Sequence, residues 1–244
     1  MTAAYLLVSH GSRDPHPQIA ARQLADFLRQ ELEPRSSVPT PNLPLVGTAT
    51  LECTSVPLHQ QIQEFASQVI AARIKRLKIL PLFLLPGVHL REDIPREIAL
   101  ARQVIDSSVS LELQPLMGSN QGLLTLLSQK FAQLPAPERI LLSHGSRYPQ
   151  ANEAIARLAD QLGAVAAYWS VSPSLAEQVA NFLSKNRQNI AIVPYFLFYG
   201  GTVRAIARQV EELQAAFPSL QLHLGEPLGA TPELARLIVE GVEN

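Results

Sequence analysis

Cysteine is almost absent from this chain of 244 residues, which contains one, Cys53. A single cysteine excludes an internal disulfide bond. It also excludes a metal or iron–sulfur site built from cysteines alone within one chain. Its neighbour Glu52 invites a soft-metal site, but a thiol buried for packing is the more common situation. We therefore expect Cys53 to be a buried packing residue.

An excess of charge of either sign is also missing. The chain has 20 basic and 21 acidic residues, for a formal net charge of −1. This balance argues against broad electrostatic binding to nucleic acid or to an anionic membrane surface. No run approaches the ~20 apolar residues of a membrane span, and the N-terminus lacks the features of a secretory signal. We expect a cytoplasmic protein that binds neither nucleic acid nor membrane.

One phrase is present twice. Leu-Val-Ser-His10-Gly-Ser-Arg13 stands near the start, and Leu-Leu-Ser-His144-Gly-Ser-Arg147 stands past the middle. Each copy follows a short apolar run and precedes an amphipathic stretch, so each places a histidine where a strand turns into a helix. The interval between the copies is the length of a small domain, well beyond the ~20 to 50 residues of a solenoid repeat. The chain therefore reads as a duplicated domain.

Strand-like and helix-like segments alternate along both halves, which predicts an α/β fold with parallel sheets covered on both faces. With 47% hydrophobic residues the chain can bury one large core or two modest ones. The expected strands are 4–8, 45–51, 77–84, 109–113, 140–142, 164–169, 190–196 and 220–224. The expected helices are 17–33, 58–72, 95–105, 121–131, 152–162, 175–183, 203–217 and 234–242.

Each half should form one domain with a four-stranded parallel sheet flanked by helices. The expected domains are 1–134 and 138–244, because two prolines interrupt the helical pattern between Leu134 and Glu138. In the first helix the apolar spacing turns one face inward. That face consists of Ile19, Leu24, Phe27, Leu28 and Leu32.

The two halves differ at the residues most able to bind a metal. Aligning Pro81 with Pro194 matches the glycines and arginines that follow, but it sets His89 against Thr202. In the same way, Glu52 falls opposite about Trp169. The scaffold is duplicated, but these side chains are not.

Only the N-terminal half offers His10, Glu52 and His89 together. Each residue follows a different strand, and the carboxyl ends of parallel strands share one edge of the sheet, so all three can converge there. Two imidazoles and a carboxylate suit a borderline divalent metal such as iron, cobalt, nickel or zinc. They also suit proton transfer near neutral pH.

These features resemble the class II tetrapyrrole chelatases, specifically the long, two-domain sirohydrochlorin chelatases. The resemblance rests on the repeated His-Gly-Ser-Arg phrase, on the phrase Pro-x-Phe-Leu-x-x-Gly-x-His that ends at His89, and on the tandem duplication. It covers nearly the whole chain. It implies a chelatase-like fold with a flavodoxin-like strand order. It also implies insertion of a divalent metal into sirohydrochlorin, with ferrous iron giving sirohaem and cobalt giving a cobalamin precursor.

The resemblance also implies roles for the two histidines. His10 and His89 would bind the incoming metal, and one of them would accept pyrrole protons. From the chemistry of its side chain, Glu52 would complete the metal's shell or take a proton. The metal, ferrous iron by preference or else cobalt or nickel, is a substrate, and no permanent cofactor is implied. The second half matches only the first phrase, so no second active centre is expected at His144.

Substrate binding is expected from hydrogen-bond donors beside the strand-to-helix junctions. Sirohydrochlorin carries many carboxylates, which arginine binds in a bidentate manner and which helix N-termini attract. The expected substrate-binding residues are Ser12, Arg13, Arg91, Arg147 and Arg204.

The residues leave alternatives open. A tetrapyrrole or metal carrier without turnover would use the same groups. A phosphoryl-transfer enzyme with His10 as nucleophile needs an arginine just before that histidine, where Ser9 stands. His10 and His144 also suit bracing of the glycine turn, and Glu52 suits a helix N-terminus. A duplicated chain can do alone what a single domain does as a dimer, so we expect a monomer.

Overall fold

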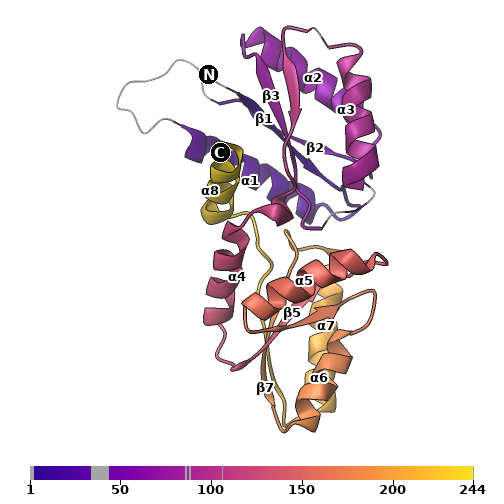
Figure 1. The fold of residues 1–244 in the computed structure, drawn as a ribbon, viewed down its shortest axis with the longest axis vertical. Coiled ribbons are helices and arrows are strands. Elements are labelled where there is room, and N and C mark those ends of the chain that lie inside the picture. The colour runs from indigo at the N-terminus through magenta and orange to yellow at the C-terminus, as the bar shows by residue number, and fades with distance from the viewer. Residues whose placement is uncertain (1–2, 34–43, 86, 88, 106, 244) are drawn as a thin grey trace. The chain divides into compact units, whose positions relative to one another are not determined.

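The computed structural model of the chain describes residues 3–33, 44–85, 87, 89–105 and 107–243. It contains two four-stranded parallel sheets with the same strand order. The first sheet runs β2 (Val46–Thr50), β1 (Ala4–Ser9), β3 (Arg76–Pro81), β4 (Ser110–Leu113), and the second runs β6 (Val165–Tyr168), β5 (Glu138–Ser143), β7 (Asn189–Pro194), β8 (Gln221–Leu224). The expected α/β fold, its duplication and its flavodoxin-like order are confirmed (Figure 1).

Helices connect the strands as the amphipathic pattern predicts. They are α1 (His16–Leu32), α2 (Leu58–Ala71), α3 (Ile94–Arg102), α4 (Gly122–Ala132), α5 (Pro149–Gln161), α6 (Leu175–Ser184), α7 (Gly201–Ala216) and α8 (Pro232–Glu243). Two short turns were not predicted, the π-helix η1 (His89–Asp93) and the 3₁₀ turn η2 (Met117–Ser119). Within the described ranges, no helix has both the length and the apolar character needed to cross a bilayer.

The first sheet is buried on both faces, as a parallel sheet with crossover helices must be. Side chains alternate along β1, so Leu6 and Val8 join the core formed with α2 and α3, and Leu7 is buried on the opposite face. Figure 1 shows α2 and α3 on one side of this sheet and α1 and α8 on the other. Leu24 is buried on the inner face of α1, as predicted. The prediction is wrong at Ile19, which is 49% exposed. The buried face of this helix includes the small residues Ala21 and Ala25 instead.

The compact units of the structure do not follow the expected domain boundaries of 1–134 and 138–244. Unit 1 comprises Met1–Asn120 and Ala230–Asn244, and unit 2 comprises Gln121–Gly229. The last helix of each repeat thus lies in the other repeat's unit: α4 packs on β7, and α8 packs on α1. Apolar periodicity shows which face of a helix is buried but not which of two similar sheets buries it. The expected linker at 134–138 accordingly lies inside unit 2, between α4 and β5.

Candidate metal and substrate site

His10 stands directly after β1, at the carboxyl edge of the unit 1 sheet. The backbones of β1 and β2 stay paired past the sheet, because the Glu52 N–H donates to the His10 carbonyl at 2.9 Å. Gly11 has φ +97°, and a Cβ there would lie 2.0 Å from the Glu52 carbonyl oxygen. Only glycine satisfies both conditions. The His-Gly pair is therefore what lets the Glu52 loop lie against His10.

The side chains of His10 and Glu52 face each other. His10 Nδ1 lies 3.9 Å from Glu52 Oε2, and the two side chains are 50% and 48% exposed. Two ligand atoms each about 2.1 Å from one cation lie roughly 3 to 4 Å apart, so this spacing suits two ligands of a single ion. The His10 ring also approaches Phe83, which follows β3, with 6.3 Å between ring centroids. The site thus draws on the ends of three strands and is open to solvent.

His89 begins η1, the π-helical turn that precedes α3, and its side chain lies outside the described part of the structure. Single π-helical turns occur often at functional sites. The Arg91 N–H donates to the Gly87 carbonyl, as the Arg204 N–H donates to that of Gly200. This shared turn supports the alignment of the two phrases. Among the described side chains, no group of three or more His, Cys, Asp and Glu forms a metal-binding cluster.

The residue opposite Glu52 in unit 2 is Ser170, so the expected partner Trp169 is wrong by one position. The Ser170 N–H donates to the His144 carbonyl at 2.9 Å, as Glu52 does to His10. Strand pairing sets this correspondence: Ser9 pairs with Thr50 and Ser143 with Tyr168, so the second residue after the strand is Glu52 in unit 1 and Ser170 in unit 2. His144 Nδ1 lies 3.1 Å from the Gly145 carbonyl oxygen, so this ring braces its own turn.

Gln61, near the start of α2, holds both ends of the loop that carries Glu52. Its Nε2 donates to the carbonyls of Thr50 and Val56, each at 2.8 Å, and its Oε1 accepts from the Thr50 N–H. The loop then turns outward, and Cys53 is exposed with φ +58°. The expectation of a buried thiol was wrong, because this loop leaves an edge strand. The role of Gln61 was not predicted from the sequence, since one amide on a helix forms no recognisable motif.

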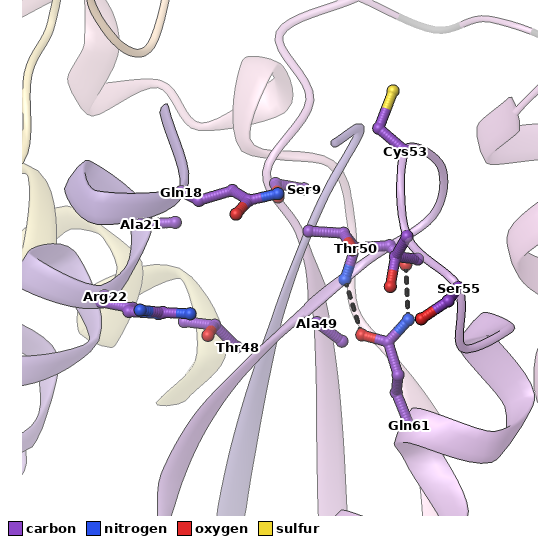
Figure 2. A pocket seen from close by; sticks show the side chains of 11 residues that line it. Ser9, Gln18, Ala21, Arg22, Thr48, Ala49, Thr50, Cys53, Ser55 and Gln61 are labelled. Atoms are coloured by element: carbon purple, nitrogen blue, oxygen red, sulfur yellow. Dashed lines mark hydrogen bonds between the residues drawn. The ribbon is translucent and has the colours of Figure 1, made fainter. Parts of the chain in front are cut away.

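A polar pocket of about 440 Å³ adjoins this loop. Figure 2 shows Gln18 and Arg22 of α1 on one side of it and Gln61 on the other. Arg22 is the one cationic side chain in its lining, and the hydroxyl and amide groups beside it suit a carboxylate. The lining consists of Ser9, Gln18, Ala21, Arg22, Thr48, Ala49, Thr50, Cys53, Thr54, Ser55 and Gln61. Two of these residues, Ser9 and Cys53, are sequence neighbours of His10 and Glu52.

The expected substrate-binding residues stand at the carboxyl edges of their own sheets. In unit 1, Arg13 and Arg91 are exposed, while the Ser12 hydroxyl accepts from the Asp14 N–H at 3.0 Å and so shapes the turn into α1. In unit 2, Arg147 is exposed and Arg204 lies half-buried in the first turn of α7. Each of the five therefore lies near a strand-to-helix junction.

A hydrogen-bonded contact between His59 and Glu97 joins α2 to α3. His59 Nδ1 lies 2.8 Å from Glu97 Oε2, and the His59 N–H donates to the same oxygen at 3.0 Å. Burial of the Glu97 carboxyl raises its pKa, but hydrogen bonds from the backbone and ring of His59 outweigh burial, so the pKa lies below its ordinary value. Glu97 thereby fixes the start of α3, the helix that continues η1.

Comparison with known proteins links both halves to one family. The family model described as CbiX matches residues 4–134 and again residues 138–244. The sirohydrochlorin cobaltochelatase of Priestia megaterium is 24% identical over 98% of this chain and 78% of its own length. The sirohydrochlorin ferrochelatase of the same organism is 23% identical over 99% and 90%. The solved structure of SirB from Bacillus subtilis with Fe3+ has a TM-score of 0.78 at 21% identity, over 100% of this chain and 95% of that one, so the fold is shared.

Proposed function

Since the chain belongs to the CbiX family, we propose that it is a sirohydrochlorin chelatase, an enzyme that inserts a divalent metal ion into sirohydrochlorin. The observation that carries the proposal is the pair formed by His10 Nδ1 and Glu52 Oε2, 3.9 Å apart at the carboxyl edge of unit 1. In unit 2 the equivalent position is Ser170, a poor ligand for such a metal. Two full-length relatives are named for this reaction with two different metals.

The proposed catalytic residues are His10, His89 and Glu52, all in the first repeat, 1–134. The two imidazoles bind the incoming metal and Glu52 completes its shell. Metallation removes two protons from pyrrole nitrogens, and a neutral imidazole or the Glu52 carboxylate accepts them. Few ligands in an open site hold the metal weakly enough to release it into the macrocycle. The half-exposed side chains of His10 and Glu52 support such an open site.

The proposed substrate-binding residues hold the carboxylates of the macrocycle. Arginine forms bidentate pairs with carboxylates, and four arginines stand at sheet edges. These residues are Arg13, Arg91, Arg147 and Arg204, with Ser12 beside them. The polar pocket that contains Arg22 is a further place for one carboxylate arm.

Ferrous iron is the proposed metal, which would make the product sirohaem. Cobalt would give a cobalamin precursor, and nickel is a third substrate that these ligands accept. Imidazole and carboxylate bind all three ions, with affinity rising from iron to cobalt to nickel, so the metal supplied to the enzyme decides which is inserted. We also propose that the duplicated chain acts as a monomer without a permanent cofactor.

The test is anaerobic absorbance spectroscopy of the protein with sirohydrochlorin. Ferrous iron, cobalt and nickel are added in separate runs, each beside a run without protein. We expect the spectral conversion to be accelerated, with rates that rank the three metals. Tight binding of sirohydrochlorin without acceleration by any metal would contradict the proposal and identify a carrier instead.

A further inference from the structure

Four aromatic side chains are exposed among the described residues, and three of them gather at one edge of unit 2. Tyr148 is 56% exposed, Trp169 38% and Tyr199 42%. Tyr148 follows β5, Trp169 follows β6 and Tyr199 follows β7, so all three stand at the carboxyl edge of the sheet. The fourth, Phe217, ends α7 at the opposite edge. Scattered exposed apolar residues are ordinary, whereas a group of them marks a binding surface.

The topology places the ends of the three preceding strands side by side. Strand β5 lies between β6 and β7, and neighbouring strands are about 4.8 Å apart. The Trp169 N–H donates to the Ser143 carbonyl at 2.9 Å, which fixes Trp169 beside the end of β5. We call Tyr148, Trp169 and Tyr199 the aromatic edge. In unit 1 the residue in the place of Trp169 is Leu51, so this edge is specific to unit 2.

Positive charge borders the aromatic edge. Arg147 is exposed and adjoins Tyr148, and α7 begins two residues after Tyr199, with Arg204 in its first turn. The N-terminus of this 16-residue helix adds a partial positive charge. Aromatic rings favour a flat conjugated ligand, while the arginines and the helix end favour carboxylates at its rim.

We infer that the aromatic edge binds the face of the tetrapyrrole by stacking, with Arg147 and Arg204 on its carboxylates. The inference rests on the proposed function and assigns the two units different tasks. Unit 1 supplies the metal ligands. In unit 2, Ser170 and Thr202 replace Glu52 and His89, so this edge can bind the macrocycle without competing for the metal.

The experiment measures binding of metal-free sirohydrochlorin by absorbance titration of the full chain. Trp169→Leu and Tyr199→Leu should each raise Kd about tenfold, the usual size of losing one aromatic stacking surface. Trp169→Phe keeps a ring and should stay within about threefold of wild type. The matched control is Phe217→Leu, which removes a ring of similar exposure (44%) from the other edge and should leave Kd unchanged.

Steady-state insertion rates separate stacking from a general defect. The KM for sirohydrochlorin should rise with Kd in the two Leu variants, while kcat and the half-saturating metal concentration stay within about twofold. Equal Kd values in all variants of an enzyme that inserts metal would overturn the inference and leave the proposed function standing. A reduced kcat with unchanged KM would also overturn it. A wild-type protein that neither binds nor metallates sirohydrochlorin would overturn both.

Discussion

Identical phrases place two histidines in different chemical surroundings. His10 Nδ1 faces the Glu52 carboxylate at 3.9 Å, whereas His144 Nδ1 lies 3.1 Å from the carbonyl of its own neighbour, Gly145. The cause is the residue opposite each histidine, Glu52 in unit 1 and Ser170 in unit 2. The Ser170 hydroxyl donates to the His144 carbonyl at 2.8 Å and so completes a closed turn. The side chain opposite each histidine therefore distinguishes His10, a candidate metal ligand, from His144, which braces its own turn.

We predict that His10→Ala lowers the rate of metal insertion more than about 100-fold at limiting metal. Removing a residue that only hydrogen-bonds to a metal ligand typically lowers metal affinity or activity about 10- to 100-fold. His10 is a proposed ligand itself, so its removal should cost more. His144→Ala is the matched control and should change the rate less than about threefold, because its ring braces a turn. Rates are compared at saturating sirohydrochlorin. Equal losses in the two variants would contradict the asymmetry between the units.

At the scale of elements, apolar spacing predicted nearly every strand and helix. The first five residues of β1 are apolar and buried, and α2 begins at Leu58 as its pattern indicates. The spacing could not predict η1, because a π-helical turn depends on local hydrogen bonding and leaves no hydrophobic period over five polar-rich residues. Within the candidate site, the sequence predicted that His10 and Glu52 lie at the same edge of the sheet. It did not predict the hydrogen bonds by which Gln61 holds the Glu52 loop. That contact joins a helix to a loop and has no motif.

The Glu97–His59 contact behind η1 predicts a pH-dependent stability. The pKa of Glu97 is below its ordinary value of 4.5 in the folded chain. A carboxyl with a lowered pKa stabilises the fold above its unfolded pKa, and this contribution is lost as the pH falls through the folded value. Glu97→Gln should therefore be less stable than wild type at pH 7, and the two should converge as the pH falls through the lowered pKa of Glu97 in the folded chain.

Urea unfolding at a series of pH values from neutral to acid checks this. The control is Glu64→Gln, an exposed carboxyl on the same helix as His59, which should follow wild type throughout. A constant difference between Glu97→Gln and wild type at every pH would show that the carboxylate charge is not what stabilises this contact.

At the scale of the whole molecule, the last helix of each sequence repeat belongs to the other compact unit. Helix α8 closes unit 1, although unit 2 separates it in sequence from the rest of that unit. Lys78, buried on β3, donates from Nζ to the Val242 carbonyl at the end of α8, and Asn120 Nδ2 donates to the Leu237 carbonyl at 2.7 Å. A cation at a helix C-terminus is favourable. The sequence repeat and the folded unit are therefore different divisions of this chain.

A chain ending at Gly229 should consequently lose stability in unit 1 and keep it in unit 2. Removing α8 exposes the surface that buries Leu234 and Ile238, each worth about 1.5 to 3 kcal/mol. It also leaves Lys78 buried without the Val242 carbonyl. Losses of this size are a large part of the free energy of unfolding of a typical domain, which is about 5 to 15 kcal/mol. Far-UV circular dichroism should then show an early thermal transition that the full chain lacks.

Trp169, the single tryptophan, belongs to unit 2, so its fluorescence follows the unfolding of that unit. Its fluorescence transition should stay within a few degrees of the full chain's, and a synthetic peptide of residues 230–244 should restore the lost stability of unit 1 when added back. If the tryptophan transition moved down together with the early transition, unit 2 would also depend on α8. If neither transition moved, α8 would contribute little to the stability of unit 1, and the contact between Lys78 and the Val242 carbonyl would not be needed for that stability.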